Sequence, residues 1–153
     1  MTALTEQHLR YLISLEPADK ELLKQEYYQL TGKQFRRQNM MLMTKKIKEQ
    51  LIKNFTANVN REEPIDHVPV LKLFGGGSCT WLITEYDQEN DILFGLCDLG
   101  MGFPEVGHVS FQELREVRFK PFGLGIERDR HFRTDKTLSQ LADEATQAQR
   151  ITA

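Results

Sequence analysis

Apolar side chains recur every three or four residues in the first sixty positions, which is the spacing of one helix face. One such segment begins near Leu4 and ends before Pro17, and a second ends near Gly32. The third stripe consists of Met40, Met43, Ile47, Leu51 and Phe55. The sequence therefore predicts three amphipathic helices, the third over residues 38–55.

The pattern changes after residue 60. Residues 61–69 are polar and contain two prolines, which is typical of a linker. Short runs of β-type residues follow, and the polar segment 87–91 lies between two of them as a hairpin loop. The expected strands cover residues 70–74, 78–87, 91–98 and 125–132.

The expected hairpin has a definite register. A loop over 87–91 pairs Tyr86 near Ile92 and places Asp98 opposite Thr80. Glu85 and Asp98 then lie at opposite ends of the hairpin, roughly 17 Å apart at about 3.4 Å per residue. The two carboxylates are therefore not expected to act on one substrate atom.

Two capping-box patterns predict helices in the second half of the chain. Ser110 with Glu113 would begin a short helix over 111–118, and Thr137 with Gln140 would begin a C-terminal helix.

These elements predict an α+β fold, with N-terminal helices, a small and mainly antiparallel sheet, and a C-terminal helix. We expect one compact unit with three parts: a basic helical region at 1–60, a linker at 61–69, and an α+β domain at 70–153.

Composition agrees with a soluble protein. The 153 residues are 40% hydrophobic and 27% charged, and they suffice for one well-buried core. No apolar run approaches the roughly 20 residues that span a bilayer, and no secretory signal is recognisable.

The same hairpin register places Cys97 opposite Trp81 and diagonal to Cys79, on a face that we expect to be core. Buried, reduced thiols of this kind predict a cytoplasmic protein.

Charge is unevenly distributed along the chain. The net charge is −2, but residues 33–61 contain eight basic residues and one acid, so that segment carries +7 and the remainder −9. Such a segment can bind nucleic acid or another anionic partner, form a solvated helix face, or dock onto the acidic half of the protein. The candidate nucleic-acid contacts are Lys33, Arg36, Arg37, Lys45, Lys46, Lys48 and Lys53.

The segment 94–110 contains four glycines, but their spacing does not match a dinucleotide-binding or phosphate-binding loop. We expect these glycines to turn the chain. Asp98 precedes the turn, and we expect its carboxylate to accept hydrogen bonds from backbone N–H groups there. Glu105 could do the same after the turn.

The run at 125–132 offers a catalytic alternative. Alternation would place Glu127, Asp129 and His131 on one strand face at intervals of about 7 Å, where they could bind a divalent metal or share a proton. With Asp98 or Glu105 they would form a small metal-dependent or acid/base hydrolase. They could equally be the wet side of an edge strand. No second pair of His, Cys or Asp residues with the spacing of metal ligands accompanies them, so we expect neither a metal nor a cofactor.

The other candidates for chemistry are isolated. His67 and His108 are expected to be loop residues rather than ligands. Ser78 and Ser110 lack the G-x-S-x-G setting of a nucleophile.

Five motifs carry a resemblance: VPVLKLF, TWLITE (TWL-x-TE), FGLCDLGMGFPEVGHVS (FGLCDLG-x-GFPE-x-G), PFGLGIERDRHF (IERD-x-HF) and a closing L-S-x-x-A-x-E-A helix. Over residues 68–151 the chain resembles a bacterial family of unknown function that is encoded on plasmids and other mobile elements. The resemblance implies a compact bacterial cytoplasmic domain and a mobile-element context. It implies no activity and no catalytic residues.

Taken together, the sequence favours a non-enzymatic accessory or interaction protein of a mobile element, contacting nucleic acid or a host protein. The hydrolase built on Glu127, Asp129 and His131 remains the alternative. A purely structural subunit is a third reading.

Overall fold

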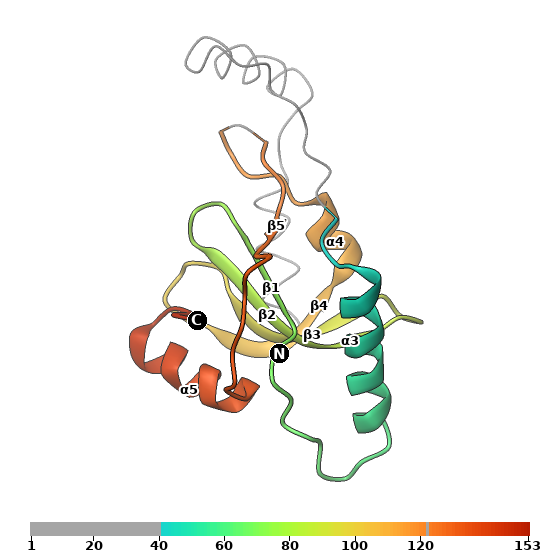
Figure 1. The fold of residues 1–153 in the computed structure, drawn as a ribbon. Coiled ribbons are helices and arrows are strands. Elements are labelled where there is room, and N and C mark those ends of the chain that lie inside the picture. Colours follow the sequence, from blue (N-terminus) through green and yellow to red (C-terminus); the bar gives the residue numbers. More distant parts are fainter. Residues whose placement is uncertain (1–40, 122) are drawn as a thin grey trace.

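A five-stranded antiparallel sheet with helices on both faces forms the fold (Figure 1). The computed structural model describes residues 41–121 and 123–153, so the two helices expected before residue 40 lie outside the described residues. The elements are α3 (Lys45–Asn58), β1 (Leu71–Gly75), β2 (Cys79–Asp87), β3 (Ile92–Asp98), β4 (Glu105–Ser110), α4 (Phe111–Glu116), β5 (Glu127–Arg128) and α5 (Leu138–Ala148). The α+β prediction is confirmed.

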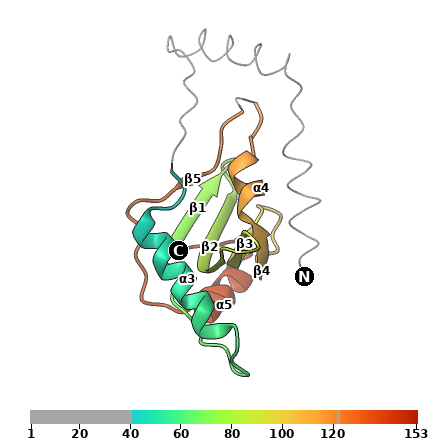
Figure 2. The same cartoon turned by 90° about the vertical axis from the view of Figure 1, so that its right-hand side faces the viewer.

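The strands lie in the order β4-β3-β2-β1-β5, so the long strand β2 occupies the centre. The first three predicted strands are confirmed within one residue at each end. Figure 2 shows β5 beside β1 at the edge of the sheet, where Arg128 pairs with Leu73.

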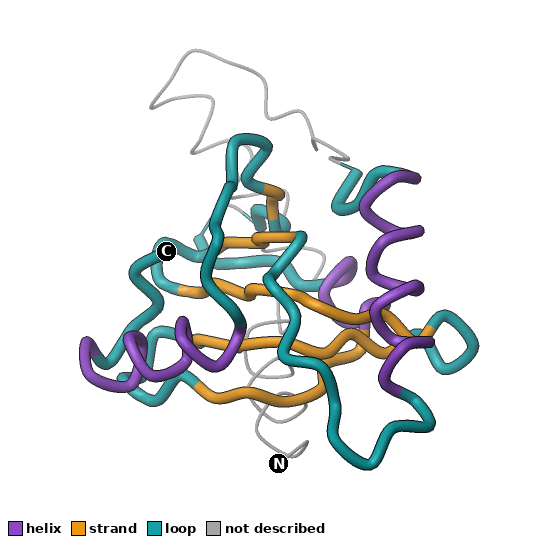
Figure 3. The backbone as a smooth tube through the Cα atoms, turned by 60° about the horizontal axis from the view of Figure 1, so that its bottom comes forward, coloured by secondary structure: helices purple, strands orange, loops and turns teal. Residues whose placement is uncertain are grey.

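Each face of the sheet contributes to a separate apolar cluster. Trp81 and Ile83 in β2 face the side covered by α3 and α4, where Leu51 of α3 is fully buried. Leu82, between them, faces the other side and packs with Leu141 of α5. Figure 3 shows α3 and α5 on opposite sides of the strands. Because β2 is covered on both faces, it is buried almost throughout.

The hairpin register is confirmed at one end and shifted at the other. Asp98 lies opposite Thr80, as expected, but Tyr86 pairs with Leu93 rather than Ile92. A β-bulge between Ile83 and Glu85 causes the shift, because Thr84 is an extra residue in β2. Side chains beyond the bulge therefore change faces relative to a regular strand.

The third predicted helix begins later than its apolar pattern suggests. Leu42 and Met43 are buried in the core, but they precede the helix. Thr44 is the N-cap, and its Oγ1 accepts a hydrogen bond from Ile47 N at 3.2 Å. The apolar spacing continued across the cap because the preceding residues also face the core.

Both helices that were predicted from capping boxes are present. Ser110 Oγ accepts a hydrogen bond from Glu113 N at the start of α4. Thr137 and Gln140 form the complete reciprocal box at the start of α5.

The segment 105–110 is a strand that the sequence pattern did not reveal. β4 pairs with β3, and Glu105 lies opposite Cys97. The turn before it is confirmed: Gly100 and Gly102 have φ values of +76° and +84°, a conformation that favours glycine. A Cβ on Gly100 would also lie 2.3 Å from Ser78 Oγ.

Cys79 and Cys97 are free and buried, and Trp81 pairs with Cys97, as the register predicts. Among the helices at residues 41–121 and 123–153, none combines the length and the apolar character needed to cross a bilayer.

Candidate functional site

Asp98, a candidate acid of the hydrolase reading, is engaged in the architecture. Its side chain is 3% exposed. Oδ1 accepts a hydrogen bond from Gly100 N at 2.9 Å, and Oδ2 accepts one from Ile151 N at 2.9 Å. The first bond confirms the predicted tie to the turn. The second joins β3 to the segment that follows α5.

The strand that was expected over 125–132 is wrong in length, since β5 contains only Glu127 and Arg128. Asp129 N still donates to Lys72 O, but Asp129 Oδ1 accepts a hydrogen bond from His131 N at 2.9 Å and turns the chain away. Asp129 Oδ2 also lies 3.8 Å from Lys72 Nζ. The predicted alternation therefore stops at Arg128, and His131 is exposed in the following turn.

The described residues contain no group of three His, Cys, Asp or Glu side chains arranged to hold a metal ion. Glu105, the last acid of the hydrolase hypothesis, lies in β4 opposite Cys97. Asp98 and Asp129 hold backbone groups in different parts of the fold. The structure thus gives these three acids separate local settings, and among the described residues they form no shared metal cluster.

The basic residues of α3 face away from the sheet. Leu51 and Asn54 are buried against it, whereas Lys45, Lys46 and Lys53 are exposed. Lys48 lies half-buried at the flank. Lys33, Arg36 and Arg37 lie outside the described residues.

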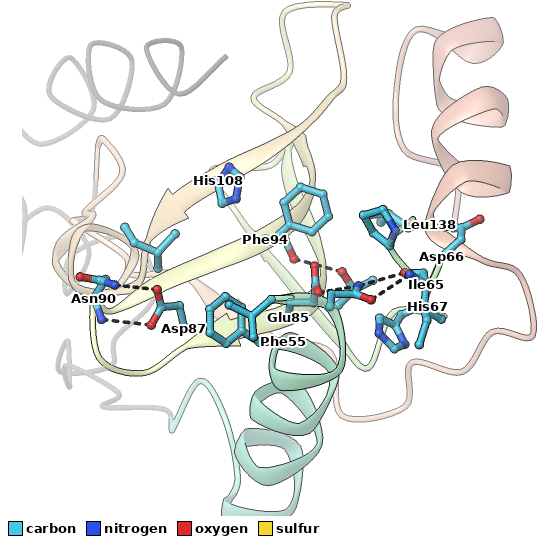
Figure 4. A pocket seen from close by; sticks show the side chains of 15 residues that line it. Phe55, Ile65, Asp66, His67, Glu85, Asp87, Asn90, Phe94, His108 and Leu138 are labelled. Atoms are coloured by element: carbon cyan, nitrogen blue, oxygen red, sulfur yellow. Dashed lines mark hydrogen bonds between the residues drawn. The ribbon is translucent and has the colours of Figure 1, made fainter. Parts of the chain in front are cut away.

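A pocket lies at the end of β2 that β1 does not cover. The pairing of β1 with β2 ends at Leu71 and Ile83, and β2 continues to Asp87 beside the C-terminal half of α3 and the segment 59–67. The pocket has a volume of about 490 Å³, within the range of small-ligand sites. Its lining residues are Phe55, Asn58, Val59, Pro64, Ile65, Asp66, His67, Thr84, Glu85, Asp87, Asn90, Ile92, Phe94, His108 and Leu138 (Figure 4).

Glu85 is the most buried carboxylate of the pocket, with 8% of its surface exposed. The bulge places it on the same face of the sheet as its partner Phe94 and the neighbouring Leu82. Asn54 of α3 holds the bulge, because its Nδ2 donates to Thr84 O at 2.9 Å. In Figure 4 Glu85 lies in the middle of the pocket.

Asn58 ties Glu85 to the segment 59–67. Its Nδ2 donates to Glu85 Oε1 at 2.7 Å and to Ile65 O at 3.1 Å, while its Oδ1 accepts from Ile65 N at 2.8 Å. Within the described part of the chain, the other carboxylate oxygen of Glu85 has no hydrogen-bond partner. His67 Nε2 is also buried without a partner there. The pocket thus contains two polar groups whose hydrogen-bonding capacity is unused.

Two further carboxylates line the pocket. Burial acts to raise the pKa of Asp66, but hydrogen bonds from Thr137 and Ser139 outweigh it, so the pKa lies below its usual value. Hydrogen bonds from Asn90 lower the pKa of Asp87. Both groups are therefore ionised at neutral pH.

This site is one that sequence reasoning missed. Glu85 was considered only with Asp98, and His67 and His108 were expected to be unrelated loop residues. The structure places Glu85, His67 and His108 around one pocket, and His108 lies in β4 rather than in a loop. The only local signal was the TWL-x-TE motif, which marks Glu85 but does not reveal the bulge that turns it toward these neighbours.

Comparison with known proteins gives one match. Neither the curated proteins nor the solved structures that were compared contain a match to this chain. A family model described as "Protein of unknown function (DUF2958)" matches residues 42–152, which begin just before α3 and include every described helix and strand. This match covers well over half of the 153 residues, and the chain belongs to that family.

Proposed function

We propose that this chain is a non-enzymatic accessory protein of a bacterial plasmid or other mobile element, that it works in the cytoplasm, and that it binds nucleic acid. The observation that carries the nucleic-acid part is the outer face of α3, where Lys45, Lys46 and Lys53 are exposed together. The mobile-element context rests on the motif resemblance, and the location on the two free, buried thiols.

The geometry of α3 supports binding of a polyanion over docking of these lysines onto the protein itself. The single ion pair of the helix lysines with a described acid is Lys45 with Glu49, at 3.9 Å on the same helix. Their side chains are 91% and 64% exposed, so the pair is weak. The lysine charges are therefore available to phosphates.

A salt titration tests this proposal. We expect the full chain to bind fluorescently labelled DNA, single- or double-stranded, with an affinity that falls steeply between about 25 and about 300 mM salt. Replacing Lys45, Lys46 and Lys53 by Ala should make the plot of log association constant against log salt less steep by about 2 to 3. Each phosphate contact contributes about 0.7 to 0.9 to the magnitude of this slope. Fluorescence anisotropy measures both quantities.

A matched triple variant controls for net charge. Lys120, Arg130 and Arg133 are exposed cations outside α3, and their replacement by Ala should leave the slope unchanged. Equal slopes for the two triple variants would remove α3 as the interface. Absence of binding at about 25 mM salt would overturn nucleic-acid binding, and a host or mobile-element protein would then become the alternative partner.

A further inference from the structure

We propose that the pocket around Glu85 binds an organic cation, namely an ammonium or guanidinium group on an apolar body, and that the Glu85 carboxylate contacts the charged nitrogen. This site is lined by residues at the C-terminal end of α3 and beside Phe94, and none of the α3 lysines is among its lining residues.

Charge complementarity is the first argument. The pocket is lined by three carboxylates, those of Asp66, Glu85 and Asp87, and no lysine or arginine is among its lining residues. Asp66 and Asp87 accept hydrogen bonds from Ser139 N and from Asn90, which fix their positions at the rim. The pocket therefore attracts positive charge, although the neighbouring helix face is basic.

The free acceptor of Glu85 is the second argument. One of its oxygens is held by Asn58 at 2.7 Å, so the orientation of the carboxylate is fixed. The other oxygen lacks a partner in the described part of the chain and keeps some accessible surface, although the residue as a whole is more than nine-tenths buried. A buried carboxylate is costly unless it is paired, and a ligand cation would supply the missing partner.

The walls of the pocket provide the third argument. Phe55 of α3 and Phe94 of β3 contribute aromatic rings, and Ile65 and Leu138 contribute aliphatic surface. Aromatic faces attract cations, and aliphatic walls bury the apolar body to which the cation is attached. The buried Nε2 of His67 is a second unused polar group for the same ligand.

Two sources can supply this chemistry: a free small amine or guanidine, and the side chain of an arginine or lysine in another protein. The probes are n-butylguanidinium and a blocked Ala-Arg-Ala peptide. Their neutral matches are n-butylurea and the same peptide with citrulline in place of arginine. Tighter binding of the peptide than of n-butylguanidinium assigns a protein side chain, and equal binding assigns a free cation.

The experiment is an NMR titration of the ¹⁵N-labelled full chain. We expect saturable shifts of the amides of Thr84, Glu85 and Phe94 with the cationic probes. The neutral matches should bind at least tenfold more weakly. This comparison uses the unmodified protein, so it stands even where a variant fails to fold.

A pair of isosteric variants isolates the carboxylate. Glu85→Gln keeps an oxygen that can accept from Asn58 but removes the charge, and we expect at least tenfold weaker binding of both cationic probes. Glu89→Gln makes the same change of charge at an exposed residue of the hairpin loop outside the pocket, and it should bind as the wild type does. Undiminished binding by a folded Glu85→Gln, equal binding of neutral and cationic probes, or no saturable shift in the wild type would overturn the proposal.

Discussion

The carboxylate of Asp98 joins two parts of the chain that are more than fifty residues apart. It accepts one hydrogen bond from the turn that follows β3 and one from Ile151 beyond α5. Hydrogen bonds to a carboxylate are stronger than those between neutral groups, and a buried carboxylate without them would destabilise the fold. At the scale of single residues, the acid of the FGLCDLG motif therefore serves the fold.

Replacing Asp98 by Asn should destabilise the protein by about 1 to 3 kcal/mol, because the amide would present an NH₂ group to one of the two N–H donors. Urea denaturation, followed by the fluorescence of the single tryptophan, measures the free energy of unfolding. Asp135→Asn is the matched control, since Asp135 is exposed, and it should change stability little. An equal effect of both substitutions would show that the two hydrogen bonds contribute nothing measurable.

Among the elements, α5 depends on the residue that precedes it. Thr137 Oγ1 accepts from Gln140 N, and Gln140 Oε1 accepts from Thr137 N. Thr137→Ala should lower the free energy of unfolding by about 1 kcal/mol, because an N–H group of the first turn loses its acceptor. Thr56→Ala on the exposed side of α3 should not destabilise the protein, since alanine favours a helix interior. Denaturation of the two variants side by side gives the difference, and a Thr137→Ala protein as stable as the wild type would refute the cap.

The elements also show which features a sequence can predict. The helix caps and the Asp98 turn involve residues two or three positions apart, so their residue types alone predicted them. The bulge at Thr84 could not be predicted in this way, because its carbonyl is held by Asn54, thirty residues earlier.

The candidate site was unpredictable for the same reason. Asn58 holds Glu85, which lies 27 positions later in the sequence. Leu138 N donates to His67 O at 2.9 Å, and these two residues precede and follow the strands in the sequence. The short β5 is a related case, because the turn at Asp129 competes with an alternating pattern that would otherwise continue the strand.

In the whole molecule, the two thiols report on global unfolding. Cys79 and Cys97 are 5% and 8% exposed. Burial raises the pKa of both, that of Cys97 to about 12. Since only the thiolate reacts, nearly all Cys97 side chains are in the unreactive thiol form at pH 8.

We therefore expect Cys97 to react with Ellman's reagent in the folded protein only as fast as the chain opens. Both thiols should react rapidly once guanidinium chloride has unfolded the protein. Release of the coloured thiolate measures this rate. Stoichiometric labelling of both cysteines within minutes under native conditions would contradict a closed core.

The bulge at Thr84 determines which face of the sheet each later residue of β2 occupies. Thr84 is the extra residue, so its removal would leave a regular strand in which Ile83 still pairs with Gly95 and Glu85 still pairs with Phe94. Glu85 would keep its place beside Phe94, and Tyr86 would keep its edge-on contact with Phe111. A protein of this family that lacked this residue would lose the hydrogen bond from Asn54 to the Thr84 carbonyl, but its acid and its aromatic residue would stay on their present faces, so a deletion at this point should be tolerated better than one elsewhere in the strand.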